Sequence, residues 1–141
     1  MRIVAAALAA LMLSACSALT TLNATDKDVK LSIQEKALGA MPVKVDMRNT
    51  SFGNYEFRAV RTDGKAMYGI LPLKFNGHQL ALNILFFAPA SFFNLREVYA
   101  LYEFDVGANV IRYRSSESEP WMEMKPTPAE AERAMKYFGG A

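Results

Sequence analysis

The chain has 141 residues, with 16 Lys or Arg against 14 Asp or Glu, a formal net charge of +2 and a hydrophobic fraction of 52%. This near balance of charge leaves no basic footprint for nucleic acid, so we expect no nucleic-acid partner. One Cys and one His exclude an intrachain disulfide and a metal site built from several such ligands. The length is that of a single domain, with enough apolar residues to form a hydrophobic core.

The first residues have the layout of a secretory signal peptide. A positive charge at Arg2 precedes an unbroken apolar run over residues 3–13, and the small residues Ser14 and Ala15 follow. A helix of this run would be roughly 16 Å long, whereas the hydrocarbon core of a bilayer is about 30 Å thick. The run is therefore too short to be a permanent membrane span.

The tetrapeptide Leu13-Ser14-Ala15-Cys16 resembles the lipobox of bacterial lipoproteins. The resemblance covers residues 1–16. It implies that the Cys16 thiol is alkylated with diacylglycerol, that a dedicated peptidase removes residues 1–15, and that the new amino group is acylated, with palmitate as a typical fatty acid. The alternative is an ordinary signal peptide with a chance Cys at its cleavage site. Because Ser17 rather than Asp follows the Cys, analogy with enteric sorting favours the periplasmic face of the outer membrane over the inner membrane.

We expect residues 16–28 to form a lipidated tether and residues 29–141 to form a single domain. The stretch from Ser17 to Asp28 is polar, rich in Thr and short of large apolar groups, as linkers are. Its shortness predicts that the folded domain sits close to the membrane.

Several later segments alternate apolar with polar residues, which predicts half-buried strands. Asp63-Gly64 and Asn76-Gly77 are strong hairpin signals, since both residue types accept a positive φ in a two-residue loop. A similar loop at Ala108-Asn109 would place Asp105 opposite Arg112 and so pair their charges. The expected strands include residues 29–33, 43–48, 55–61, 95–106 and 110–114, together with the segments that flank the two hairpin signals.

One helix is expected near the end of the chain. Thr127 is a capping residue, Pro128 suits the first helical position, and Glu130 completes a capping box. Apolar residues follow at helical spacing, and Gly139 ends the segment. The predicted fold is therefore α+β: a mostly antiparallel, meander-like sheet of six or seven strands with one C-terminal helix packed on it. The apolar stripe consists of Ala131, Ala134, Met135 and Phe138.

Groups that could carry chemistry are few. His78 stands beside a predicted turn, which indicates a surface residue. Glu103 and Asp105 lie two apart on one strand face and could act as acid and base. The competing interpretation, which we favour, is that Arg112 and Arg114 neutralise them on a solvated face. We expect no catalytic residue, no metal site and no cofactor.

The segment from Leu80 to Phe93 is the most unusual part of the mature chain, because it holds no charged residue. Two interpretations stay open. It forms a core loop under the C-terminal helix, or it forms a hydrophobic tip that contacts the membrane or a partner, as large exposed apolar patches do. The residues of this membrane or partner contact would be Phe86, Phe87, Phe92, Phe93 and Arg96.

The sequence thus predicts a non-enzymatic lipoprotein of the cell envelope with a structural or protein-interaction role. Its expected partners are the membrane, through the lipid, and an envelope protein. An alternative is a binding module for a small hydrophobic or lipid ligand held between sheet and helix. A hydrolase built on Glu103 and Asp105 is a third and weaker hypothesis.

Overall fold

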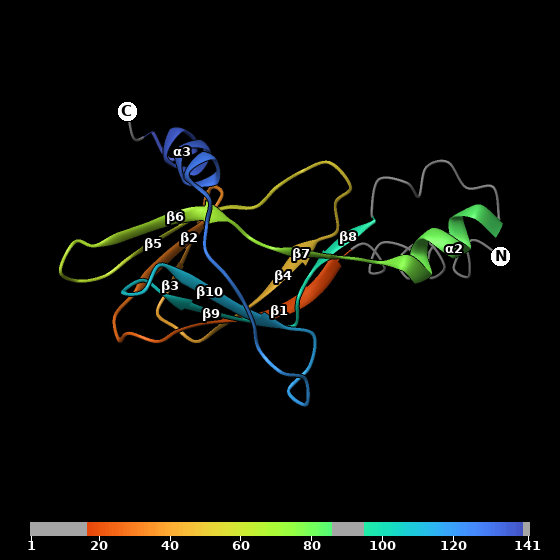
Figure 1. The fold of residues 1–141 in the computed structure, drawn as a ribbon, viewed down its shortest axis with the longest axis horizontal. Helices are drawn as coiled ribbons and strands as arrows, with labels where there is room; N and C mark the ends of the chain where they lie inside the picture. Colours follow the sequence, from red (N-terminus) through yellow and green to blue (C-terminus); the bar gives the residue numbers. More distant parts are fainter. Residues whose placement is uncertain (1–16, 86–94, 140–141) are drawn as a thin grey trace, which may run out of the picture.

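A computed structural model of the protein describes residues 17–85 and 95–139, and within them eleven strands and two helices. The strands form a five-stranded, a four-stranded and a two-stranded sheet (Figure 1). Almost all strand pairs are antiparallel, and a single C-terminal helix packs on the sheets, so the predicted α+β class is confirmed. The strands are more numerous than the predicted six or seven and belong to three sheets rather than one.

The five-stranded sheet has the order β11-β10-β9-β1-β4. Strand β1 lies inside it, parallel to β9 on one side and antiparallel to β4 on the other. The strands are β1 (Ser17–Ala24), β4 (Val43–Arg48), β9 (Leu101–Asp105), β10 (Val110–Arg114) and β11 (Met122–Met124).

The four-stranded sheet has the order β3-β2-β5-β6. Its strands are β2 (Lys30–Ile33), β3 (Lys36–Gly39), β5 (Glu56–Val60) and β6 (Ala66–Ile70). The small third sheet pairs β7 (Leu73–Phe75) with β8 (Arg96–Val98), and helix α2 (Gly77–Leu85) follows β7. No helix in residues 17–85 and 95–139 is both long and apolar enough to cross a membrane.

The hydrophobic core combines side chains from the two larger sheets. In β1, β2, β6 and β9 alternate residues are buried in it, as the two-residue period of a strand requires. Phe57 of β5 and Phe104 of β9 meet edge to face, with ring centroids 5.1 Å apart, and both are fully buried. Other large buried members of this cluster are Leu22, Leu31, Met67, Tyr102 and Ile111.

The C-terminal helix α3 (Pro128–Tyr137) begins as predicted. The Thr127 hydroxyl accepts a hydrogen bond from the Glu130 amide, and the Glu130 carboxylate accepts one from the Thr127 amide. The helix packs on β5 and β6: Ala134 is fully buried, and Arg133 Nε contacts the buried carboxylate of Glu56 at 2.9 Å. Gly139, with a φ of +74°, follows the helix, as predicted.

The predicted tether is wrong over most of its length. Residues 17–24 form strand β1, in which Leu22 is fully buried and Thr20 is 1% exposed. The Thr residues that indicated a linker are β-branched and pack well in a sheet. Ser17, which follows the predicted lipidation site, therefore already belongs to a strand.

The hairpin at Asp63-Gly64 exists, but its register is one residue off. A two-residue loop at Asp63-Gly64 would place Val60 opposite Met67, whereas Val60 faces Ala66. The Arg61 amide donates to Lys65 O at 2.9 Å. The loop has three residues and ends on Gly64 with a φ of +86°, a common alternative to the two-residue loop.

The prediction of a hairpin at Asn76-Gly77 is wrong. Asn76 precedes helix α2, and the Leu80 amide donates to Asn76 O at 3.2 Å. Asn is favoured both in tight turns and immediately before helices, so the dipeptide by itself did not distinguish the two structures.

The register between β9 and β10 differs from the prediction by two residues. Arg112 faces Glu103, and Asp105 faces Val110 across a longer turn. A shift of two keeps every side chain on its predicted face. Arg112 therefore still reaches Asp105, diagonally.

Candidate functional site

The two carboxylates considered as an acid–base pair share one cation. Arg112 Nη1 lies 3.0 Å from Glu103 Oε1, and Arg112 Nη2 lies 3.6 Å from Asp105 Oδ2. Arg112 Nε also donates to Glu123 Oε1 at 2.7 Å. The carboxylate of Glu123, and next that of Glu103, raise the pKa of the Arg112 guanidinium. The arrangement is a structural ion-pair network in which a fixed positive charge contacts both candidate groups.

Arg114 does not take part in this network, contrary to the prediction. Its guanidinium lies 4.3 Å above the Trp121 ring, and Nη1 donates to Glu117 O at 2.8 Å. The cation–π contact holds Trp121 against the sheet.

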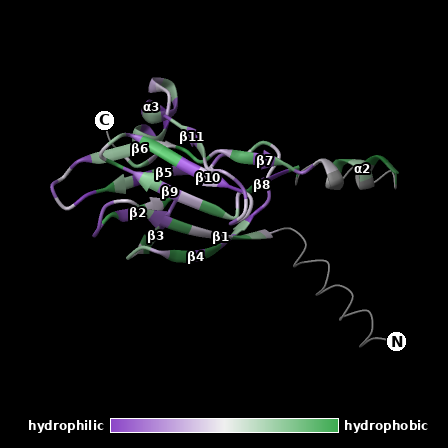
Figure 2. Cartoon of the chain, turned by 60° about the horizontal axis from the view of Figure 1, so that its bottom comes forward, coloured by the Kyte–Doolittle hydropathy of each residue, from purple (hydrophilic) through white to green (hydrophobic). Residues whose placement is uncertain are grey.

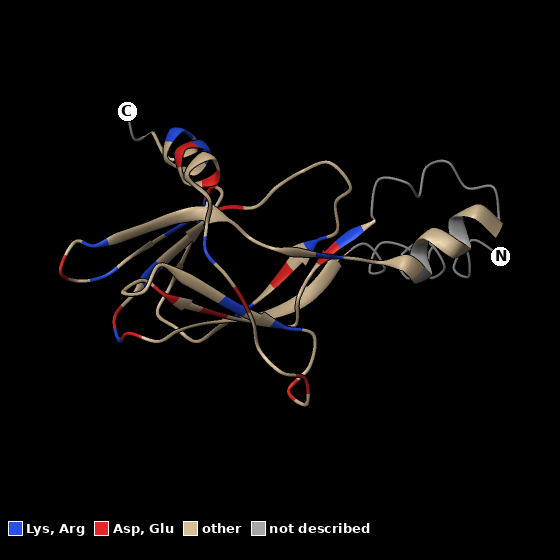
Figure 3. Ribbon diagram, in the orientation of Figure 1, with Lys and Arg blue, Asp and Glu red and all other residues tan. Residues whose placement is uncertain are grey.

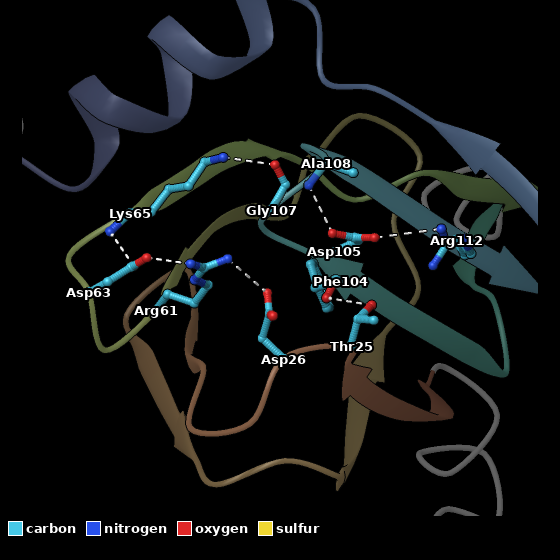
Figure 4. Close-up of polar contacts among 10 residues, drawn as sticks. All are labelled: Thr25, Asp26, Arg61, Asp63, Lys65, Phe104, Asp105, Gly107, Ala108 and Arg112. Atoms are coloured by element: carbon cyan, nitrogen blue, oxygen red, sulfur yellow. Dashed lines mark hydrogen bonds and ion pairs between the residues drawn. The ribbon is translucent and has the colours of Figure 1, made fainter.

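A second polar network joins three loops at one end of the molecule (Figure 4). Arg61 bridges Asp63 in the β5–β6 hairpin and Asp26 after β1, the latter at 3.5 Å. Lys65 Nζ donates to Gly107 O in the β9–β10 turn at 2.7 Å. We call this group, Asp26, Arg61, Asp63, Lys65 and Gly107, the ion-pair end.

Asp63 is the centre of the ion-pair end. Its carboxylate accepts a hydrogen bond from the Lys65 amide at 3.0 Å and pairs with Arg61. The Lys65 amide, and next the Arg61 guanidinium, lower the pKa of the Asp63 carboxyl below its usual value. The network ties loops together with partners already in place, so it leaves no group directed at a ligand.

Helix α2 lies at the opposite end of the molecule (Figure 1) and carries apolar residues (Figure 2). Helix α2 carries no Lys, Arg, Asp or Glu (Figure 3). Its Ile84 and Leu85 are 61% and 70% exposed. Phe75, just before the helix, and Phe52, in the loop after β4, are also exposed. We call α2, Phe75 and Phe52 the α2 end.

Arg96 supports this end rather than projecting from it. Its backbone pairs with Thr50 in both directions at 2.8 Å, and its Nη2 donates to Gly53 O at 2.8 Å. These bonds hold the loop that presents Phe52. The structure therefore places Arg96 next to the loop that carries the exposed Phe52, and its role as a contact residue stays a prediction.

The other predicted contact residues are not placed. Phe86, Phe87, Phe92 and Phe93 lie outside the described residues, as does Cys16. His78 belongs to the first turn of α2 rather than to a hairpin turn. Phe52 was not among the predicted contact residues, although a large aromatic residue within residues 49–54, which are otherwise Asn, Thr, Ser and Gly, was a usable signal.

A cleft of about 430 Å³ lies between β3, β4 and the end of α3. Apolar groups from all three elements line it, including Leu38, Val45 and Tyr137. Tyr55 lies at its side and donates its hydroxyl hydrogen to Arg48 O, and burial raises the pKa of the Tyr55 hydroxyl. Its volume is that of a small-ligand pocket.

In residues 17–85 and 95–139, no group of three or more His, Cys, Asp or Glu side chains could hold a metal ion. Comparison with protein-family models, with curated proteins and with solved structures finds no match to this chain. The features of the chain that bear on function are the resemblance to a lipobox, the exposed apolar end and the cleft.

Proposed function

We propose that the protein is a non-catalytic lipoprotein of the bacterial envelope, anchored through Cys16 on the periplasmic face of the outer membrane. The observation that carries the proposal is the start of β1 at Ser17, the residue bonded to the predicted lipidation site. Without a linker, lipid on Cys16 attaches directly to an inner strand of the five-stranded sheet. The domain would be held at the bilayer surface, as suits a structural or protein-interaction role there.

The strength of membrane attachment depends on the number of fatty chains on the anchor. Each buried CH₂ group contributes about 0.8 kcal/mol, so one fatty chain binds only marginally and two or more hold stably. A diacylglycerol group alone supplies two chains, and an acylated amino group adds a third. The lipid therefore suffices for stable attachment.

The anchor is tested by replacing the Cys. We expect Cys16→Ser to abolish labelling by a fatty-acid analogue and to release the protein from membranes or leave it unprocessed. Fatty-acid label on the Cys16→Ser protein would contradict the anchor. Ser17→Asp is the matched control: it should keep the label but move the protein to the inner membrane, as density-gradient fractionation would show.

The interaction role is tested by crosslinking in intact cells. A discrete crosslinked product that is obtained with the anchored protein and lost with Cys16→Ser supports a partner at the membrane. Recovery of the monomer alone, over a range of crosslinker lengths, would contradict the interaction role.

A second candidate function is the binding of a small hydrophobic or lipid ligand. It is favoured by the cleft beside Tyr55 and Tyr137, which lies between strands and helix α3. Native mass spectrometry of the purified protein should then show a bound small molecule, and Val45→Trp, which fills the cleft, should remove it. Detection of the ligand-free mass alone would reject this candidate.

A further inference from the structure

The α2 end is an apolar surface that the described part of the fold leaves uncovered. Ile84 and Leu85 expose more than half of their surface on a helix without charged side chains. In the sequence, no Lys, Arg, Asp or Glu occurs between Lys74 and Arg96. A partner that fits such a surface is itself apolar.

This end also carries the attachment point of the chain. Ser17 pairs with Arg48 at the end of β4, and two residues later Thr50 bridges to Arg96 in β8. Arg96 in turn pairs with Phe75, the last residue before α2 begins. A short path of paired strands thus connects the first residue of β1 to the helix, and the ion-pair end lies at the other end of the long axis (Figure 1).

We propose that α2 docks on the lipid surface of the membrane that carries the anchor, as a second contact that fixes the orientation of the domain. The proposal rests on the proposed lipidation of Cys16, which brings this end to the bilayer. Nine helical residues are only about 13 Å long, so α2 rests at the interface and does not span. With Ile84 and Leu85 in the lipid, the ion-pair end would point into the periplasm.

The test uses the processed, lipidated protein in vesicles of phosphatidylethanolamine and phosphatidylglycerol. Since Cys16 is the only Cys and its thiol is blocked by lipid, Leu85→Cys introduces a single free thiol for an environment-sensitive fluorophore. Met135→Cys on α3 is the matched control, because Met135 is also an exposed apolar residue on a helix.

Docking predicts a blue shift of the Leu85→Cys label in vesicles and its quenching by spin-labelled lipid, with neither effect at Met135→Cys. Equal spectra and equal quenching at the two positions would overturn the proposal. A blue shift at Leu85→Cys that appears only in native membranes, and not in protein-free vesicles, would also overturn it and assign the surface to a protein partner. If Cys16 itself takes up the label, the lipidation fails, and this outcome is distinguishable from a failure of docking alone.

Discussion

The two ends of this molecule handle their exposed groups in opposite ways. At the ion-pair end, Arg61 bridges two carboxylates and Lys65 reaches the carbonyl of a neighbouring turn, so the loops hold one another. At the α2 end, the side chains of Ile84, Leu85 and Phe52 are exposed to solvent. Charged loops that satisfy one another stabilise the fold by themselves, whereas exposed apolar side chains gain nothing until another surface covers them. The proposed membrane contact would cover the α2 end and leave the ion-pair end in water.

The largest expected effect is the difference in unfolding free energy between a substitution in the core and one at the α2 end. Phe57→Ala should lower the free energy of unfolding by about 3–5 kcal/mol, because it removes a fully buried ring packed on Phe104. Leu85→Ala should change it by no more than about 0.5 kcal/mol, as surface substitutions do. Urea unfolding of both variants measures the difference. If Leu85→Ala is as destabilising as Phe57→Ala, α2 belongs to the packed fold and the contrast between the ends disappears.

The sequence was most informative where local chemistry decides the structure. The capping box of Thr127 and Glu130 requires only residues close in the chain, and helix α3 starts where it predicted. The hairpin at Gly64 was likewise found from its turn residues, although not its register.

The local sequence pattern could not predict which strands pair when they lie far apart in the chain. Strand β1 is an inner strand because β9, some eighty residues later, pairs with it in parallel, and no local signal in residues 17–24 announces that partner. The β9–β10 register failed for a related reason. Arg112 satisfies Glu103 directly and Asp105 diagonally, so charge matching alone accepts two registers that differ by two residues. The lack of charged residues between Lys74 and Arg96 indicated an exposed apolar segment. That this segment follows strands linked by pairing to Ser17 could be seen only in the structure.

A smaller effect tests whether β1, which would carry the proposed anchor, is part of the core. Thr20 is 1% exposed, and its hydroxyl has no hydrogen-bond partner among the described residues. Thr20→Val keeps the shape and removes the unsatisfied group, so it should raise the free energy of unfolding by about 1 kcal/mol. Thr21→Val, at a half-exposed position on the other face, should change it by less than about 0.5 kcal/mol. Destabilisation by Thr20→Val would mean that its hydroxyl is bonded and that this packing is wrong.

The smallest effect concerns the ion-pair end. Because folding lowers the pKa of the Asp63 carboxyl from 3.8, its charged form stabilises the fold above that pH, and the contribution is lost as the pH falls through the lowered value. Asp63→Asn should therefore be less stable than the wild type near neutral pH, with the gap closing in acid. Thermal unfolding between neutral pH and pH 2 measures the gap. A gap that stays constant over this range would show that the Asp63 charge does not contribute.

The most direct test compares amide hydrogen exchange at the two ends of the lipidated protein, in detergent and in vesicles. The account predicts that the amides of α2, residues 77–85, exchange more slowly in vesicles, because the helix rests against lipid there. The amides of the β5–β6 hairpin around Asp63 should exchange at the same rate in both. Slower exchange at the hairpin, or an unchanged rate in α2, would contradict an orientation in which the apolar end faces the membrane.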